Sequence, residues 1–210
     1  MEPDLLSCGN LKYRKRWGSK LLTFGLPSVK TCPNAGACAS GCYARQGHYI
    51  MAPVRNKEEQ RHKATLLPQF HQRMTDEIDR RKPKIVRVHD SGDFYEKLYL
   101  LQWLIVGYAC PNVTFFAYTK MVSMVRDARA KKLIPKNWHF VFSEGGIEDK
   151  LIRLADLQAR VFETQAAISR SKGYVNASKD DISLILKGHK KLGLVYHGWK
   201  SKAFHTGGGK

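Results

Sequence analysis

Three cysteines fall within one short segment of small residues. Residues 31–44 read TCPNAGACASGCYA and place Cys32, Cys38 and Cys42 at a C-x5-C-x3-C spacing. Thiolates are soft ligands that suit zinc and iron–sulfur clusters, and the alanines and glycines between them leave room for backbone N–H groups to approach the sulfurs. The segment therefore predicts a metal site, and we expect a [4Fe-4S] cluster with three cysteine ligands and one open iron.

A zinc site and a disulfide are the alternative interpretations of the same cysteines. Structural zinc sites take four ligands, usually as two close pairs, and here the fourth ligand would have to be His48 or another distant histidine. A disulfide between two of the three cysteines would leave one spare thiol. The chain has five cysteines, an odd number that fits a reducing compartment better than a disulfide framework, so we expect a cytoplasmic protein.

Strand and helix patterns alternate along the chain and would position these cysteines. Apolar runs predict strands at 21–26, 84–88, 113–118, 138–142, 160–163 and 194–196. Helical patterns lie between them, at 43–49, 54–81 with a break at Pro68, 95–110, 121–131, 149–157 and 180–191. Such alternation is typical of right-handed βα units around a parallel sheet. About six strands are too few for a complete eight-unit barrel. An open sheet and an incomplete barrel both remain, and the fold class we expect is α/β, a partial TIM-like barrel around a parallel sheet.

Length and composition favour a single domain over residues 1–210. The chain is 43% hydrophobic, which is enough for one core. Residues 1–20 form a basic N-terminal segment, and the GGGK at 207–210 is interpreted as a tag remnant. No apolar run resembles a signal peptide or reaches membrane-spanning length, so we expect no membrane partner.

Polar residues follow the expected strands, at the ends where βα folds carry their sites. The cysteine segment follows the first strand, and later strands are followed by residues 89–93, 118–120, 143–146, 163–165 and 197–198. We expect catalytic roles for His89, Asp90, Asp93, Tyr118, Lys120 and Glu144. We expect ligand binding by Ser143, Glu144, Gly145 and Gly146. Cys8 and Cys110 lie away from this edge of the sheet, and we expect neither to be a metal ligand.

Each of these motifs also has a purely structural interpretation. Asp93 is placed to cap the following helix, with Glu96 at the capping-box position, and this role does not exclude a second one. Residues 143–146 read as a tight turn whose glycines also let backbone approach a ligand. Lys120 is either a surface lysine or a cation for a phosphate or carboxylate. What favours a functional site is that all of these motifs lie at the same edge of the expected sheet.

A strong excess of positive charge predicts an acidic partner. Lys and Arg number 36 against 18 Asp and Glu, which gives a formal net charge of +18. Basic residues cluster at 12–20, 55–63, 80–84 and 187–191, and Tyr13 and Trp17 in the first cluster add rings that suit stacked bases. Any one cluster is equally explained as a solvated face, but the summed excess favours a polyanion such as nucleic acid.

Several longer motifs occur together in this chain. TCPNAGACASGCYARQG, VRVHDSGDFY and FFAYTK, followed by F-S-E at 142–144, lie in this order between about residues 21 and 146. With this set the chain resembles the phage-encoded gene product eighty-eight family. The resemblance implies a viral origin, an iron–sulfur cluster on the three cysteines and a compact barrel-like fold similar to radical SAM proteins. The cysteine spacing differs from the C-x3-C-x2-C of radical SAM proteins.

Two functions fit these features. In the first, the open iron binds a small ligand such as S-adenosylmethionine and supports radical or reductive chemistry on or near nucleic acid. In the second, a non-catalytic basic protein binds nucleic acid, and its metal, an iron–sulfur cluster or zinc, is structural or redox-sensing. Both need a metal at the cysteines, and they differ in whether a small ligand reaches it.

Overall fold

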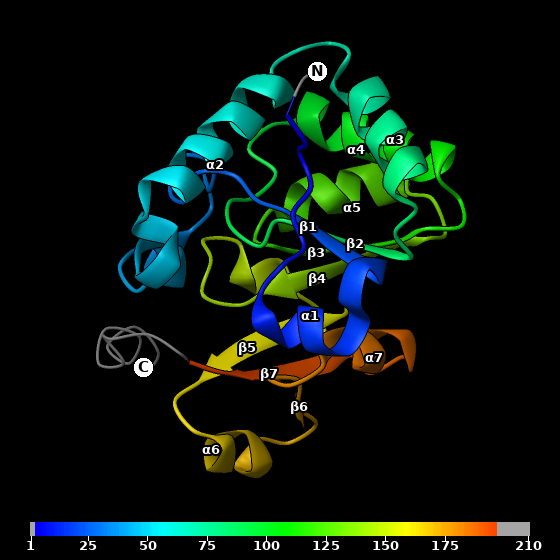
Figure 1. Ribbon diagram of the computed structural model, residues 1–210. Coiled ribbons are helices and arrows are strands. Elements are labelled where there is room, and N and C mark those ends of the chain that lie inside the picture. The colour runs from blue at the N-terminus through cyan, green and yellow to red at the C-terminus, as the bar shows by residue number, and fades with distance from the viewer. Residues whose placement is uncertain (1–2, 197–210) are drawn as a thin grey trace.

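One parallel sheet runs through the centre of the protein (Figure 1). The computed structural model describes residues 3–196. Seven strands pair in the order β1-β2-β3-β4-β5-β7-β6, each parallel to its neighbours. They are β1 (Leu21–Phe24), β2 (Ile85–Val88), β3 (Thr114–Thr119), β4 (Trp138–Ser143), β5 (Gln158–Phe162), β6 (Val175–Asn176) and β7 (Lys191–Val195). Because the strands are parallel, all begin at one edge of the sheet, the amino edge, and all end at the other, the carboxyl edge.

Seven α-helices among the described residues surround this sheet. They are α1 (Leu11–Trp17), α2 (Ala52–Thr65), α3 (Phe70–Arg81), α4 (Lys97–Ala109), α5 (Val122–Ala130), α6 (Gln165–Arg170) and α7 (Asp181–Leu186). Short 3-10 helices occur at Gly18–Lys20, Gly36–Ala39, Tyr43–Arg45, Gly47–Ile50 and Asp149–Leu151. Figure 1 shows α2 to α5 together in the upper half of the view and α1, α6 and α7 in the lower half.

The strand order explains why α2 to α5 lie on one face of the sheet and α7 on the other. From β1 to β5 each new strand adds on the same side of the last, and right-handed crossovers in one direction place their helices on one face of the sheet. The step from β6 back to β7 reverses direction and puts α7 on the opposite face, beside α1. Two separate cores result: one packs α2 to α5 around Phe70 and Trp103, and the other packs α1 and α7 around Tyr13 and Ile182.

The N-terminal segment lies along the outer side of strand β1. Ser7 and Thr23 exchange two backbone hydrogen bonds of 2.8 and 2.7 Å in an antiparallel bridge. The carboxylate of Glu77 accepts the backbone N–H of Leu5 at 2.7 Å, and the guanidinium Nε of Arg61 donates to the Leu5 carbonyl at 2.6 Å. Strand β1 lies at one end of the sheet, but this segment covers it, so β1 is buried over its whole length.

The predicted α/β class is confirmed, with an all-parallel sheet. Within residues 3–196 the sheet stays open, because β1 and β6 lie at its two ends and do not pair with each other. The break predicted at Pro68 separates α2 from α3. No helix in the described part of the chain is long and apolar enough to cross a membrane.

Some predicted elements differ from the structure. The helix expected at 149–157 is wrong: only the 3-10 turn Asp149–Leu151 forms, because the carboxylates of Asp149 and Asp156 bind backbone N–H groups of nearby loops. The helix expected at 180–191 ends at Leu186. Helices α1 and α6 and the short strand β6 were not expected. The cap role expected for Asp93 is also wrong, since α4 begins after Glu96.

Candidate metal and ligand site

A small cavity at the carboxyl edge, here called the thiol pocket, is lined by all three cysteines of the 31–44 segment. Its volume is about 110 Å³. Of the site residues expected from sequence, it contains Cys32, Cys38, Cys42, His89, Asp93, Tyr118, Lys120 and Ser143. These come from the ends of β1, β2, β3 and β4, so the parallel sheet brings together four segments that are far apart in sequence. Asp90, Glu144, Gly145 and Gly146 are not part of the lining.

The cysteine loop is held in place by the segment after β4. The backbone N–H of Cys38 donates to the carbonyl of Gly145 at 3.3 Å, and Ile147 donates to the carbonyl of Asn34 at 3.2 Å. Gly36 has a φ of 53°, and a Cβ there would lie 3.0 Å from the Gly145 oxygen. A glycine is therefore needed at position 36 for both its backbone conformation and this close approach.

Two of the residues expected to bind a ligand, Gly145 and Gly146, make hydrogen bonds within their own segment after β4. The N–H groups of Gly145 and Gly146 donate to the carboxylate of Asp149 at 2.7 and 2.8 Å. The Glu144 carboxylate accepts hydrogen bonds from the guanidinium of Arg160 and the hydroxyl of Tyr174. These bonds hold the segment that contacts the cysteine loop. The ligand-binding roles expected for Glu144, Gly145 and Gly146 stay predictions.

Two thiols of the pocket, those of Cys32 and Cys42, are partly shielded from water. Burial raises the pKa of Cys32 to about 12, with the nearby Asp93 carboxylate as a second cause. Burial also raises the pKa of Cys42. All five cysteines are free thiols, so the disulfide interpretation is wrong. Without a cation Cys32 and Cys42 keep their protons, and a bound metal ion would displace them.

The described residues contain no group of three His, Cys, Asp or Glu side chains that could hold a single metal ion as they stand. His48, the fourth zinc ligand considered above, lines a different cavity from the three cysteines. Cys110 is buried at the amino edge in the core with α4, and Cys8 is exposed. As expected, neither lines the thiol pocket.

Asp93 joins the loop after β2 to the end of β3. Its carboxylate accepts hydrogen bonds from Thr119 Oγ1 at 2.6 Å, from the backbone N–H of Lys120 at 2.8 Å and from that of Phe94 at 2.7 Å. Burial raises its pKa, which these hydrogen bonds partly offset. The carboxylate turned toward β3 leaves the N-terminus of α4 uncapped and explains the wrong cap prediction.

Lys120 places a buried ammonium group at the wall of the pocket. Its Nζ donates to the Ser143 hydroxyl at 2.8 Å and to the carbonyls of Ser143 and Glu144 at 3.1 and 3.2 Å. All three partners are uncharged acceptors, so the positive charge is held in place without a carboxylate among them. Its three N–H donors have these partners, so it would attract an anionic part of a ligand through its charge.

His89 is a neutral side chain of the pocket wall. It is 2% exposed, and its Nε2 lies 2.8 Å from the Tyr99 hydroxyl. Among the described residues its Nδ1 has no hydrogen-bond partner. Burial and, to a smaller degree, the positive charge of Arg87 lower the pKa of His89 to about 3. A neutral imidazole can donate or accept a hydrogen bond at that free nitrogen, depending on its tautomer.

Asp90 lies beside the pocket and positions two tyrosines. Its backbone carbonyl accepts hydrogen bonds from the hydroxyls of Tyr43 and Tyr49. Its side chain packs over Gly25, where a Cβ would lie 2.1 Å from Oδ1. Of the residues expected after the last strands, Thr164 caps α6 through the Ala167 N–H, and His197 and Gly198 lie outside the described residues.

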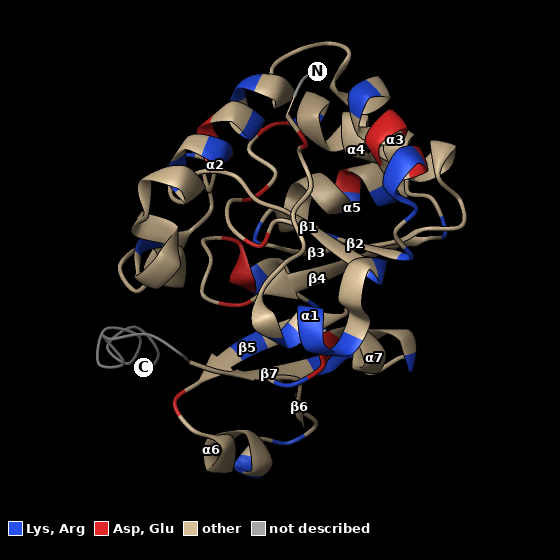
Figure 2. Ribbon diagram, viewed as in Figure 1, with Lys and Arg blue, Asp and Glu red and all other residues tan. Residues whose placement is uncertain are grey.

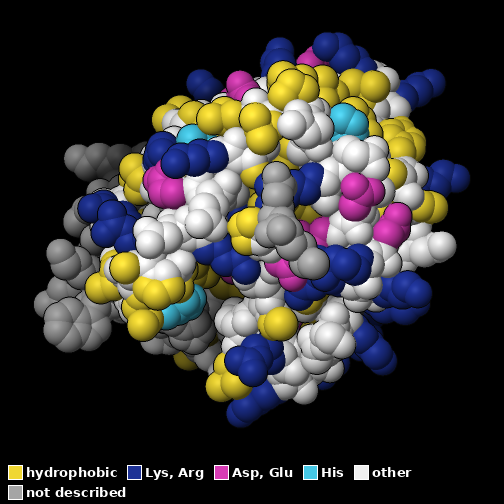
Figure 3. Space-filling view, turned by 45° about the horizontal axis from the view of Figure 1, so that its top comes forward, with side chains coloured by type: hydrophobic (Ala, Val, Ile, Leu, Met, Phe, Trp, Pro, Cys, Tyr) yellow, Lys and Arg dark blue, Asp and Glu magenta, His cyan; other side chains and the backbone are white. Residues whose placement is uncertain are grey.

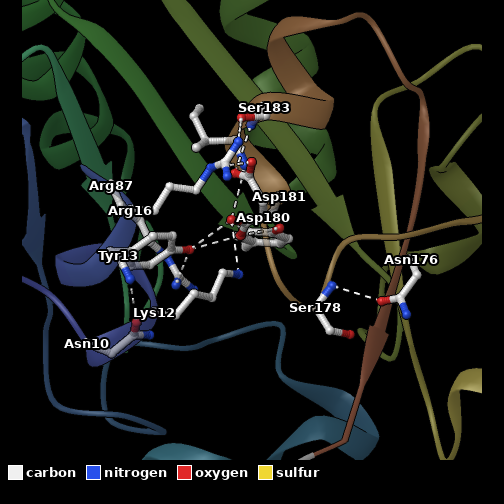
Figure 4. A network of polar contacts seen from close by, with 12 residues as sticks. Asn10, Lys12, Tyr13, Arg16, Arg87, Asn176, Ser178, Asp180, Asp181 and Ser183 are labelled. Atoms are coloured by element: carbon white, nitrogen blue, oxygen red, sulfur yellow. Dashed lines mark hydrogen bonds and ion pairs between the residues drawn. The ribbon is translucent and has the colours of Figure 1, made fainter.

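Tyr118 connects the pocket to a polar cluster around Asp181 that sequence reasoning missed. Figure 4 shows Lys12, Tyr13 and Arg87 of this cluster beside Asp181. The Asp181 carboxylate accepts hydrogen bonds from the hydroxyls of Tyr118 and Tyr13, each at 2.9 Å, and lies 3.2 Å from Lys12 Nζ. Arg87 donates to the Tyr13 hydroxyl at 2.9 Å. Burial would raise the pKa of Asp181, but Lys12 and Arg87 lower it below its ordinary value. We call Lys12, Tyr13, Arg87, Tyr118 and Asp181 the Asp181 network.

Comparison with known proteins identifies the family. The family model described as Gene product 88 matches residues 5–201. The Gene 88 protein of Mycobacterium phage D29 is 28% identical over 207 residues, which cover 88% of this chain and 86% of that protein. The Gene 88 protein of Mycobacterium phage L5 is 35% identical over 113 residues, 47% of each chain. No solved structure matches. The match along nearly the whole chain shows that this protein belongs to the Gene product 88 family of bacteriophage proteins.

Proposed function

We propose that this protein binds a [4Fe-4S] cluster through Cys32, Cys38 and Cys42. The observation that carries the proposal is the lining of the thiol pocket: these three thiols lie on one cavity at the carboxyl edge, and Cys8 and Cys110 do not. In a cluster each thiolate binds a different iron, so the ligands need to line one cavity rather than meet at one point. The soft donor set fits iron and sulfide.

Three thiolates leave one iron of the cluster without a cysteine. A bound cluster would supply electrons to a ligand at that iron, as in radical or reductive chemistry. Lys120 would hold a carboxylate or phosphate of the ligand, and Asp93 would keep the loop after β2 in position. The neutral His89 would accept or donate a hydrogen bond at Nδ1. S-adenosylmethionine is the first ligand to test, and the reaction we propose takes place on or near nucleic acid.

A barrel-like curvature of the sheet is part of the same proposal. The uniform order from β1 to β5, with α2 to α5 on one face, is how the units of a TIM barrel wind. The radical-SAM-like architecture expected from sequence would place the open iron above the concave face of such a sheet.

The test is anaerobic purification followed by iron and sulfide analysis and by electron paramagnetic resonance of the reduced protein. About four irons and four sulfides per chain are expected. Cys32→Ser and Cys42→Ser should lose most of this iron, whereas the matched controls Cys8→Ser and Cys110→Ser should keep it. Stoichiometric zinc in place of iron, or equal iron in all four variants, would overturn the cluster. A spectrum that changes on addition of S-adenosylmethionine supports the open iron, and an unchanged spectrum contradicts that part of the proposal.

Nucleic-acid binding without catalysis is the second candidate, and the distribution of lysines favours it. Figure 2 shows Lys and Arg along α1 and α2, and Figure 3 shows that acidic side chains are few beside Lys and Arg on the face it presents. Lys20, Lys84 and Lys190 are exposed and directly precede β1, β2 and β7. Three of the four basic clusters therefore reach the amino edge, opposite the thiol pocket. Cations at this edge have a structural role as well, because they complement the negative C-terminal ends of helices. Their grouping along one edge, however, suits the binding of a polyanion.

A further inference from the structure

A second and larger cavity lies next to the thiol pocket. Its volume is about 760 Å³, within the range of small-molecule sites. We call it the tyrosine pocket, because Tyr43, Tyr49, Tyr118 and Tyr196 line it together with His48. Tyr43 and Tyr118 line the thiol pocket as well, so the two cavities share a wall.

The wall of the tyrosine pocket carries more positive than negative charge. Lys12, Arg87 and Asp181 of the Asp181 network line it, which gives two cations against one carboxylate. The neighbouring pair of Arg16 and Asp180, with Nε and Oδ2 2.6 Å apart, adds one charge of each sign and leaves the excess unchanged. Figure 4 shows Lys12, Tyr13 and Arg87 gathered around Asp181.

Both cations are partly buried, and Arg87 is incompletely hydrogen-bonded. The carboxylate of Asp181 is 2% exposed and pairs with Lys12. Even with this ion pair, burial lowers the pKa of Lys12. The Arg87 guanidinium lies between the rings of Tyr13 and Tyr118, 5.4 and 5.3 Å from their centroids. Within the described residues its buried Nε has no hydrogen-bond partner. A partly buried excess cation is costly unless an anion joins it.

We propose that the tyrosine pocket binds a nucleotide. Its phosphate would pair with Lys12 and Arg87, since charge-assisted hydrogen bonds to guanidinium and ammonium groups are strong. Its base would stack on the tyrosine rings, which attract the flat face of any base. The same chemistry is offered by a free nucleotide and by the 5′ end of a nucleic acid. The inference does not depend on a cluster in the thiol pocket.

The test is calorimetric titration of the full chain with adenosine 5′-monophosphate, before and after anaerobic loading with iron and sulfide. Adenosine and inorganic phosphate, each half of the probe, should bind at least about tenfold more weakly than the nucleotide. Lys12→Gln should weaken nucleotide binding about tenfold. Lys15→Gln is the matched control, because Lys15 is exposed on the same helix and does not line the pocket.

Asp181→Asn gives a test with the opposite sign. The amide oxygen can still accept hydrogen bonds from Tyr13 or Tyr118, and removal of the carboxylate increases the excess positive charge, so the nucleotide should bind more tightly. Arg87→Gln should weaken binding if it folds, and Lys12→Gln keeps the test valid if it does not. The proposal is overturned if adenosine binds as well as the nucleotide, if Lys12→Gln binds like Lys15→Gln, or if no nucleotide binds. A 5′-phosphorylated tetranucleotide that binds more tightly than the mononucleotide identifies a nucleic-acid end as the ligand, and equal or weaker binding identifies a free nucleotide.

Discussion

At the residue scale, the protonation state of His89 follows from its surroundings. The ring is enclosed by Phe94 and Tyr99, with centroids 4.4 and 5.7 Å from its own, and its pKa is lowered to about 3 by burial and by Arg87. In the unfolded chain the pKa returns to its ordinary value of about 6.5. Between these values the unfolded state binds a proton that the folded state does not.

Stability should therefore fall as pH decreases from about 6.5 toward 3, with His89 contributing about 1.4 kcal/mol per pH unit. His89→Asn should remove this contribution, and asparagine tolerates the φ of 65° found there. Urea unfolding at pH 7.5 and pH 5.0 measures the effect: the loss on acidification should be about 2 kcal/mol smaller in His89→Asn than in the unaltered protein. The exposed His48→Asn is the control, and an equal loss in both variants would contradict the assignment.

Residue chemistry also shows where sequence reasoning succeeds and where it stops. Cys32, Cys38 and Cys42 are close in sequence, so their common pocket could be predicted from spacing alone. Tyr13 and Asp181 are 168 positions apart, and only the packing of α1 beside α7 brings them together. Arg87 stands inside an apolar strand, where nothing in the local pattern distinguishes it from a surface residue. Contacts of this kind depend on tertiary packing and leave no local signal.

At the scale of elements, the cysteine loop depends on its contact with the segment after β4. Gly36→Ala should destabilise the protein by about 1–2 kcal/mol more than Gly47→Ala. Both glycines have positive φ, 53° and 56°, but only a Cβ at position 36 meets neighbouring backbone atoms. Urea unfolding compares the two variants, and iron content should fall in Gly36→Ala only. Equal stability of the two would show that the contact contributes nothing.

Helix α4 shows a limit of reasoning from periodicity. Its sequence is apolar on all sides, but its two faces are not equally buried. Trp103 is fully buried, but Leu98, Ile105 and Tyr108 are 63%, 47% and 58% exposed. Periodicity could not reveal the buried face because apolar residues occupy both faces, so only packing against α3 and the sheet defines it.

These exposures predict unequal costs for substitutions on one helix. Trp103→Ala should lower the free energy of unfolding by about 3–5 kcal/mol, because it leaves a cavity among Phe24, Phe70 and Phe115. Ile105→Ala should cost less than about 1 kcal/mol, since half of that side chain already contacts water. Denaturant titration of both variants measures the difference, and similar costs would mean that another molecule covers the outer face of α4.

At the scale of the whole molecule, the two edges of the sheet differ in chemistry. The carboxyl edge carries the two pockets, and the amino edge carries exposed lysines at the starts of strands. If a nucleic acid binds the amino edge, a triple variant without the three lysines there should bind it more weakly; the substitutions are Lys20→Gln, Lys84→Gln and Lys190→Gln. On duplex DNA the slope of log affinity against log salt should also become smaller by about three.

The matched control removes three exposed lysines at the carboxyl edge, Lys30, Lys97 and Lys150. Fluorescence anisotropy of a labelled duplex at several salt concentrations gives both slopes. A larger loss of affinity in the control variant would show that the polyanion binds near the pockets at the carboxyl edge. Equal small losses of affinity in both variants would show only diffuse electrostatic attraction. The sequence predicted the charge but not this arrangement, because the position of a lysine relative to an edge follows from topology.

The strip of backbone at residues 5–7 that closes off strand β1 has a consequence for self-association. An uncovered edge strand offers free N–H and C=O groups to the edge of another molecule. A chain shortened to begin at residue 9 would lose the bridge to Thr23 and the bonds to Glu77 and Arg61. Such a chain should form oligomers through β1 that grow with concentration, visible by light scattering, whereas the full chain keeps this edge closed.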